Sequence, residues 1–221
     1  MYIVTGGSDG LGKAIIGSLT AVGTKVINIS RRENDSANLN LCCDLSTQIG
    51  IDAAVASILE IEESIEAVIF SAGVFSFGDV STLTGAEYER VFGINTKSPM
   101  LMLGKLIDRI KADGADIVIV NSVAGLHSYP NQMFYNASKA ALHSFTNDLR
   151  IELTETRSRV IGIYPGMLTT DLAQKLPHGP LPKSKHPTID PEALADYITY
   201  TLRLPKVMEV TDIIVDRKKL P

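Results

Sequence analysis

Short apolar segments alternate with helical segments along this chain, and the alternation limits its possible folds more than any other feature. Seven apolar segments, rich in β-branched residues, lie at about residues 2–6, 25–30, 38–45, 66–73, 115–122, 159–166 and 210–215. Stretches with apolar residues at helical spacing lie at about 10–23, 49–63, 87–111, 134–153 and 191–202. Because parallel strands need long crossover connections, the pattern predicts an α/β fold with a doubly wound parallel sheet of about seven strands and helices on both faces.

The chain is expected to form a single domain. Its 221 residues are near the size of one large α/β domain, and no internal repeat, low-complexity segment or linker divides them. Residues 168–189 carry four prolines and interrupt the helical pattern. We therefore expect one domain over residues 1–221, with a substrate loop at about 167–190 that crosses the edge of the sheet.

Charge and cysteine usage exclude several classes of protein. The chain has 21 basic and 25 acidic residues, a net charge of −4, so no basic surface favours nucleic acid. Cys42 and Cys43 are adjacent, and a disulfide between neighbours on a strand would be strained, which favours a reducing compartment. With no signal peptide and no apolar run of about 18 residues, the sequence predicts a cytoplasmic protein outside the membrane.

A glycine-rich turn, TGGSDGLG, lies between the first apolar segment and the first helical one. Gly6, Gly10 and Gly12 would allow a tight turn, close approach of a diphosphate, and close packing of the helix on the sheet. The helix N-terminus would offer free N–H groups and a positive dipole end to the phosphates. An ordinary turn is the alternative, but the position directly after a first strand favours a dinucleotide site.

The end of the second strand carries Ser30, Arg31 and Arg32 where dinucleotide-binding proteins often have an acid that accepts the ribose hydroxyls. Arginines without an acid suit a ribose that carries a 2′-phosphate, although two solvated arginines would look the same. Asp9 argues the other way: its carboxylate could repel the phosphate, or it could cap the helix and bind Arg31. On balance we expect NADP(H) to be preferred, with NAD(H) possible.

Several further motifs, in order along nearly the whole chain, resemble the short-chain dehydrogenase/reductase family in its branch of about 250 residues. The turn matches the family's Thr-Gly-x-x-x-Gly-x-Gly at Thr5, Gly6, Gly10 and Gly12, and a serine thirteen residues before Tyr-x-x-x-Lys matches at Ser122, Tyr135 and Lys139. Asn95 matches the asparagine of the long central helix, Pro165, Gly166 and Thr170 match Pro-Gly-x-x-x-Thr, and Asp44-Leu45 matches the adenine-side pair. The resemblance implies a Rossmann fold. The chain departs from the family at Phe70-Ser71-Ala72-Gly73, where Asn-Asn-Ala-Gly is frequent, and this puts the local bonding of the sheet in doubt.

The resemblance also implies a set of site residues. The catalytic tetrad would be Asn95, Ser122, Tyr135 and Lys139. The cofactor-binding residues would be Gly6, Ser8, Asp9, Gly10, Leu11, Gly12, Arg31, Arg32, Asp44, Leu45, Ser71, Ala72, Gly73, Tyr135, Lys139, Pro165, Gly166, Leu168 and Thr170.

The pair Tyr135 and Lys139 has a chemical rationale of its own. Residues four apart on a helix share one face and can act on one ligand. A free tyrosine has a pKa of about 10, and a nearby lysine cation is expected to lower it towards the range useful for proton exchange. The resemblance adds that Lys139 binds the nicotinamide ribose, Ser122 bonds the substrate oxygen and Asn95 helps to hold a water.

These features predict an oxidoreductase that passes hydride between NADP(H) and a carbonyl/alcohol pair. Two alternatives stay open: a sensor or scaffold that binds nucleotide but does little chemistry, and an isomerase or dehydratase that uses the same Tyr-Lys pair. The family also implies a homodimer or homotetramer, paired through the helices that begin near Glu87 and Gln132.

The remaining candidates are weaker. Apolar walls for a small-molecule carbonyl substrate would come from Val123, Leu126, Met133, Phe134, Met167 and the loop at 168–189, which favours a hydrophobic or aromatic compound. His127 and His143 are expected on loop and helix surfaces, and His178 and His186 in the variable loop. No cluster has metal-ligand spacing, so no metal is expected.

Overall fold

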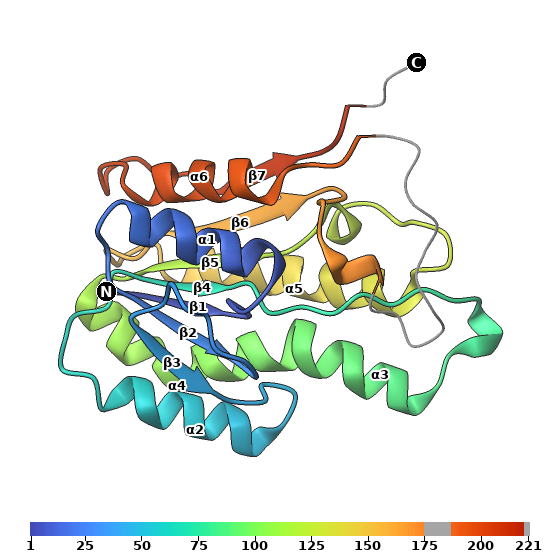
Figure 1. Ribbon diagram of the computed structural model, residues 1–221, viewed down its shortest axis with the longest axis horizontal. Coiled ribbons are helices and arrows are strands. Elements are labelled where there is room, and N and C mark those ends of the chain that lie inside the picture. Colours follow the sequence, from blue (N-terminus) through green and yellow to red (C-terminus); the bar gives the residue numbers. More distant parts are fainter. Residues whose placement is uncertain (175–186, 219–221) are drawn as a thin grey trace.

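The computed structural model describes residues 1–174 and 187–218, and its centre is one parallel sheet (Figure 1). Seven strands follow the order β3-β2-β1-β4-β5-β6-β7, which confirms the predicted doubly wound sheet. The strands are β1 (Tyr2–Thr5), β2 (Val26–Ser30), β3 (Leu39–Cys42), β4 (Ala67–Phe70), β5 (Asp116–Val120), β6 (Val160–Pro165) and β7 (Asp212–Val215).

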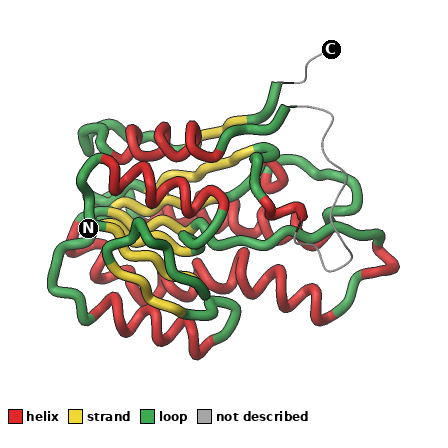
Figure 2. The backbone as a smooth tube through the Cα atoms, viewed as in Figure 1, coloured by secondary structure: helices red, strands yellow, loops and turns green. Residues whose placement is uncertain are grey.

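Helices connect most of these strands, as Figure 2 shows along the backbone. The α-helices are α1 (Gly10–Ala21), α2 (Gln48–Leu59), α3 (Gly85–Phe92), α4 (Ser98–Asp113), α5 (Met133–Glu152) and α6 (Pro191–Leu202). Short helical turns are η1 (Val80–Thr82), η2 (Gly93–Lys97), η3 (Val123–Gly125) and η4 (Asp171–Gln174). Among the described residues, no helix combines the length and the apolar character needed to cross a membrane.

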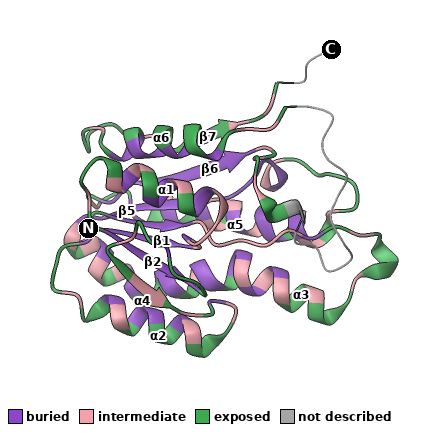
Figure 3. Cartoon of the chain, viewed as in Figure 1, coloured by how far each residue is buried: buried purple, intermediate pink, exposed green. Residues whose placement is uncertain are grey.

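Two apolar cores lie on opposite faces of the sheet. Helices α2, α4 and α5 bury apolar residues against one face, and α1 and α6 bury theirs against the other. In Figure 1, α1 is drawn across the central strands and α6 is level with β7, while α2 and α4 lie in the lower part of the view; Figure 3 shows the central strands as mostly buried. Strands β1, β4 and β5 are almost continuously apolar because both of their faces are covered in this way.

The long central helix expected at about 87–111 is interrupted. Helix α3 passes into η2, a π-helical turn, before α4 continues with Pro99 in its first turn. A π turn adds a residue to a helical turn, so it shifts the side chains that follow it around the helix axis. The one residue of the expected tetrad on this helix, Asn95, lies within this turn.

The departure from the family after β4 has a local compensation. The Thr5 hydroxyl at the end of β1 accepts hydrogen bonds from the backbone N–H of Ser71, at 3.1 Å, and of Ala72, at 3.2 Å. Bonding between the ends of β1 and β4 is therefore kept.

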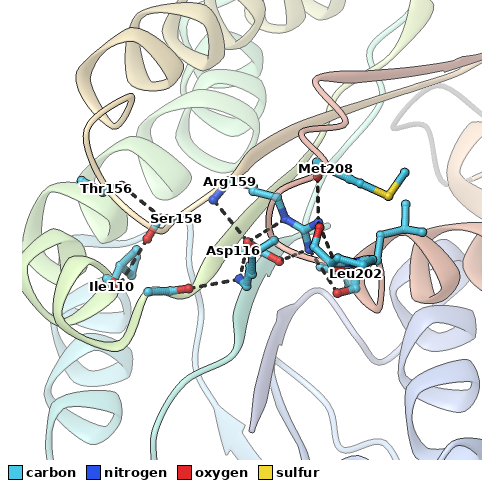
Figure 4. A network of polar contacts seen from close by, with 11 residues as sticks. Ile110, Asp116, Thr156, Ser158, Arg159, Leu202 and Met208 are labelled. Atoms are coloured by element: carbon cyan, nitrogen blue, oxygen red, sulfur yellow. Dashed lines mark hydrogen bonds and ion pairs between the residues drawn. The ribbon is translucent and has the colours of Figure 1, made fainter.

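At the opposite, amino edge of the sheet a buried ion pair joins distant parts of the chain (Figure 4). Arg159 Nη2 lies 2.7 Å from Asp116 Oδ2, and the side chains of both residues are at most 4% exposed. The same guanidinium donates to the carbonyl oxygens of Leu202, Leu204 and Met208, at 3.1–3.2 Å. This network attaches the segment after α6 to β5 and β6.

Candidate active site

The loops after β1, β4, β5 and β6 carry many of the predicted site residues. Because all strands are parallel, these loops leave the sheet at one edge, on the right in Figure 1. Strands β2 and β4 flank β1, so the connections on either side of β1 run in opposite directions along the sheet. In open α/β sheets, ligands bind at such a switch point, beyond the carboxyl ends of the strands.

Gly6 and Gly12, in the turn between β1 and α1, have no room for a side chain. Gly6 has φ +71°, and a Cβ there would lie 2.6 Å from the Ala72 Cα atom. A Cβ on Gly12 would overlap the carbonyl oxygen of Gly6. Gly10 has φ +52°, in the left-handed region that glycine adopts without strain. The turn thus brings bare backbone to the N-terminus of α1, an arrangement that fits the diphosphate of a dinucleotide.

Asp9 caps helix α1, as one of the expected alternatives had it, but the arginine that it pairs with is Arg32 and not the expected Arg31. It is the N-cap residue of α1, where its Oδ1 accepts from the Gly10 N–H at 2.8 Å. Its Oδ2 also lies 3.3 Å from Arg32 Nη2, and both side chains are partly solvent-exposed. The acid is therefore paired with Arg32 in this arrangement. Arg31 is exposed at the same edge and, together with stronger hydrogen bonds from Ser46, lowers the pKa of Asp44.

The other expected cofactor residues lie around this turn. Ser8 is half-buried in the turn, Leu11 is buried in α1, and Leu45 is buried after β3. Ser71, Ala72 and Gly73 follow β4. Pro165 ends β6, and Gly166 and Leu168 follow it. Thr170 reaches the turn itself, because a Cβ on Gly10 would lie 3.4 Å from the Thr170 Cγ2 atom. The structure thus brings the segments after β1, β4 and β6 together.

Asn95 links the end of β4 to the middle of α5. Its Oδ1 accepts from the Val74 N–H at 2.8 Å, and its Nδ2 donates to the Val74 carbonyl oxygen at 3.0 Å. Nδ2 also donates to the Ser138 hydroxyl at 3.0 Å. The oxygen and the nitrogen of the buried Asn95 amide are therefore both hydrogen-bonded. One of the partners, Ser138, precedes Lys139 in the sequence.

Ser122, Tyr135 and Lys139 meet at the carboxyl end of β5. The Ser122 hydroxyl accepts from the Ala124 N–H at 3.1 Å and lies 3.5 Å from the Pro165 carbonyl oxygen. Lys139 Nζ lies 5.9 Å from the centre of the Tyr135 ring and donates to the Val120 carbonyl oxygen at 3.0 Å.

Gly73 lies beside the same group of side chains. A Cβ on Gly73 would lie 3.6 Å from Asn95 Oδ1 and 3.9 Å from Lys139 Nζ. All four residues of the expected tetrad thus gather within one small region.

Burial shifts the pKa values of the Tyr-Lys pair in opposite directions. Burial raises the pKa of Tyr135 above its usual value, and a hydrogen bond with Ser122 opposes this rise. Burial also lowers the pKa of Lys139, to about 8. The expected lowering of the Tyr135 pKa by the lysine cation is not found: burial raises this pKa, and the opposing cause is the hydrogen bond with Ser122.

Several large apolar side chains lie on the segments that follow β4, β5 and β6. Phe77, Tyr129, Met133, Met167 and Leu172 are among the large apolar residues that stay partly exposed. Of the other expected wall residues, Val123 is buried, Leu126 is half-buried, and Phe134 packs against Tyr88 and Phe92 in an aromatic cluster. Phe75 packs edge-on against Tyr135, with ring centres 4.8 Å apart. Part of the expected substrate loop, with His178 and His186, lies outside the described residues.

The sequence did not identify the contacts of two residues on α5, Ser138 and His143. Ser138, which accepts from Asn95, lies three positions after Tyr135, so helical spacing would have placed it on the same face. His143 was expected at the helix surface but is half-buried, and its Nδ1 lies 2.8 Å from the Tyr164 hydroxyl. Nothing in the local sequence indicates that contact, because Tyr164 lies on another element. His127 is exposed, as expected.

Known proteins resemble this chain over most of its length. The sequence model of the short chain dehydrogenase family matches residues 1–180. An uncharacterized oxidoreductase of Staphylococcus haemolyticus is 25% identical, and the match covers 96% of this chain and 95% of that protein.

Solved structures resemble it as well. A short chain dehydrogenase family protein from Francisella tularensis superposes with a TM-score of 0.83 at 27% identity, over 97% of this chain and 96% of that one. The closed form of a serine dehydrogenase complexed with NADP+ superposes with a TM-score of 0.87 at 21% identity, over 97% of this chain and 93% of that one.

Proposed function

The chain belongs to the short chain dehydrogenase family of oxidoreductases, and from this membership we propose that it interconverts a carbonyl compound and an alcohol with NADP(H). The observation that carries the proposal is the meeting of Asn95, Ser122, Tyr135 and Lys139 beside the glycine turn. Similar folds have been solved with NADP+ or NADH, which supports a nicotinamide cofactor. The free thiols of Cys42 and Cys43 suit a reducing compartment such as the cytoplasm.

The cofactor would supply the hydride, and the protein would supply position and a proton. Burial keeps Tyr135 a protonated phenol at neutral pH, which suits a proton donor to the carbonyl oxygen in the reducing direction. Ser122 would donate a hydrogen bond to the same oxygen. Lys139, with a pKa of about 8, is mostly charged at pH 7 and would stabilise negative charge that develops near the phenol. Asn95 would fix the η2 turn and α5 relative to each other.

The test is reduction of a panel of apolar and aromatic ketones, aldehydes and diketones with NADPH, followed by loss of cofactor absorbance. Tyr135→Phe should lower the rate about 10²–10⁴-fold, because it removes the proton donor, while nucleotide binding survives. Tyr197→Phe on the exposed face of α6 is the control and should keep the rate. Nucleotide binding without turnover of any compound would instead favour a sensor or scaffold.

We also propose a preference for NADPH over NADH. Arg32 already compensates the charge of Asp9, so Arg31 would be the residue that binds the 2′-phosphate. Arg31→Ala should therefore raise the Michaelis constant for NADPH far more than that for NADH. Higher salt should weaken the preference, because the arginine is exposed. Equal use of both cofactors by the unmodified protein would contradict this proposal.

A further inference from the structure

The connection between β2 and β3, residues 31–38, forms bends and turns where most neighbouring strands are joined by a helix. Seven of its side chains are exposed or half-buried, but Asn34 is buried, with 5% exposure. Burial of an amide is unfavourable unless its polar groups are hydrogen-bonded. The contacts of Asn34 therefore decide where this loop lies.

Each polar group of Asn34 has a partner. Its Nδ2 donates to the carbonyl oxygen of Gly7, within the glycine turn, at 2.6 Å. Its Oδ1 accepts from the Ser36 N–H at 2.8 Å, and its backbone N–H donates to Asn40 Oδ1 at 2.9 Å. Its carbonyl oxygen accepts from the Ala37 N–H at 3.0 Å. The Nδ2 thus joins the loop to the glycine turn, while the other groups fix the shape of the loop.

The arginine end of the same loop is tied to β2. The Arg32 carbonyl oxygen accepts from Ser30 Oγ at 2.6 Å and from Asn28 Nδ2 at 3.1 Å. The Asn28 Nδ2 also donates, at 2.8 Å, to Asn40 Oδ1, the same oxygen that accepts from the Asn34 N–H. One network of side-chain amides therefore connects β2, β3 and the loop between them.

Gly7 packs closely against this network. A Cβ on Gly7 would lie 2.7 Å from Asn28 Oδ1 and would overlap Ile16 Cδ1 on α1. The glycine turn, β2 and the loop therefore form one packed unit, and a shift of the loop changes its distance from the turn.

We propose that Asn34 is a positioning residue, which holds Arg31 at a fixed place beside the glycine turn and thereby sets the preference for NADPH. The inference rests on the proposed function, because the 2′-phosphate is the group that Arg31 would bind. In a dinucleotide site the diphosphate lies at the glycine turn and the 2′-phosphate near the end of the second strand, so the two binding groups must keep one separation. An arginine that is held in advance does not have to be ordered by the ligand, and this raises affinity. Asn34 acts through Arg31.

Asn34→Ser tests the proposal, because serine keeps an acceptor for the Ser36 N–H but is too short to reach the Gly7 carbonyl oxygen. The NADPH dissociation constant should rise about threefold to tenfold, the factor that one hydrogen bond typically contributes, while that of NADH should change less than about twofold. Asn38→Ser is the matched control. Asn38 lies in the same connection, but its Oδ1 accepts from the Val26 N–H at the opposite, amino edge of the sheet, so both dissociation constants should stay unchanged. Equal rises for the two cofactors in Asn34→Ser would mean that Asn34 supports only the turn, and would overturn the proposal.

A double variant shows whether Asn34 acts through Arg31. In an Arg31→Ala background, Asn34→Ser should change the ratio of the two dissociation constants little, because the group that it positions is gone. The same fold-change with and without Arg31 would contradict the proposal. Ser30→Ala removes another anchor of the loop and tests the same idea if Asn34→Ser does not fold: the ratio should shift in the same direction, and an unchanged ratio would count against the inference.

Hydrogen–deuterium exchange tests the holding of the loop without any nucleotide. In Asn34→Ser, the hydrogen-bonded amides at positions 34, 36 and 37 should exchange faster than in the unmodified protein, and in Asn38→Ser they should not. Unchanged exchange in Asn34→Ser would overturn the inference whichever cofactor the protein uses. Faster exchange in Asn34→Ser, when the unmodified protein binds NADPH and NADH equally, would reject the proposed NADPH preference and leave Asn34 as the residue that holds the loop.

Discussion

Lys139 carries its charge at a position that is only 4% exposed, and this should cost the folded protein stability. Its pKa falls from 10.5 to about 8 on folding, so between these values the unfolded chain binds a proton that the folded chain has lost. Stability contributed by this residue therefore rises with pH between about 8 and 10.5 and is lowest below pH 8.

Lys139→Met should accordingly raise the free energy of unfolding at pH 7 by about 1–3 kcal/mol, allowing for the lost bond to Val120. The advantage over the unmodified protein should shrink as the pH rises from 8 to 10.5. Denaturant titrations at several pH values measure it. Lys105→Met, which removes an exposed lysine paired with Asp52, should give no such trend. A constant difference between Lys139→Met and the unmodified protein would mean that the amine is well hydrated.

At the scale of single residues, the sequence predicted which residues form the candidate site. It could not predict how well those side chains are hydrated or what they contact. Helical spacing is enough to place Tyr135 and Lys139 on one face, whereas Ser122 was placed beside them by the resemblance to the family. The direction of the Tyr135 pKa shift depends on hydration, which is lost only when Phe75 and the surrounding loops pack against the ring. Likewise, the contact between His143 and Tyr164 exists only after α5 docks on β6.

Two glycines of α1 differ in a way that separates packing from helix propensity. A Cβ on Gly12 would overlap the Gly6 carbonyl oxygen, whereas a Cβ on Gly17 would meet no atom within 4 Å. Gly12→Ala should lower the free energy of unfolding by about 1–3 kcal/mol through overpacking, and it should also weaken nucleotide binding by moving the turn. Gly17→Ala should raise the free energy of unfolding by about 0.5–1 kcal/mol through helix propensity.

Thermal or chemical denaturation together with titration of NADPH measures both effects. If both variants changed stability in the same direction, close packing of the turn on α1 would not be what requires glycine at position 12.

The elements themselves were largely predictable, but their irregularities were not. Seven strands and the helices between them lie close to their expected ranges, because periodicity reports burial directly. The π turn around Asn95 was not foreseen, since apolar spacing across residues 87–111 continues through it. The bonds from Asn95 to Val74 and Ser138 hold this turn, and both partners lie far from it in sequence.

On the scale of the whole molecule, the ion pair of Asp116 and Arg159 attaches the last third of the chain to the sheet (Figure 4). Arg159→Leu would leave the Asp116 carboxylate buried, with Lys206, at 2.6 Å, as its one cationic partner among the residues that the structure describes. It would also remove the donor to the carbonyl oxygens after α6. Loss of one member of such a buried pair typically costs about 3–5 kcal/mol of unfolding free energy.

Urea denaturation should detect this loss for Arg159→Leu, while kcat at low temperature should stay near that of the unmodified protein, because the pair lies at the edge opposite the site. Lys206→Met is the control, with an expected loss below about 1 kcal/mol because Lys206 is half-exposed. Equal losses in the two variants would place the main attachment elsewhere.

The exposed surface of α4 and α5 predicts that copies of this chain associate. Helices α4 and α5 cover the same face of the sheet, and each leaves a large aliphatic side chain in solvent: Leu101 is 37% and Ile151 is 74% exposed. Single exposed apolar residues are ordinary, but aliphatic residues on the two helices through which family members pair predict a dimer or tetramer. Light scattering at micromolar concentration should give at least twice the mass of one chain.

The double variant Leu101→Glu, Ile151→Glu should lower that mass, since burying carboxylates at an interface is unfavourable. Helix α6 supplies a matched control, because Tyr197 and Tyr200 are also exposed there, and glutamate at both positions should leave the α4–α5 dimer intact. A monomeric unmodified protein would exclude association. A monomer produced by the α6 variant alone would move the interface to the α6 side of the sheet, and the exposed residues of α4 and α5 would then be ordinary surface.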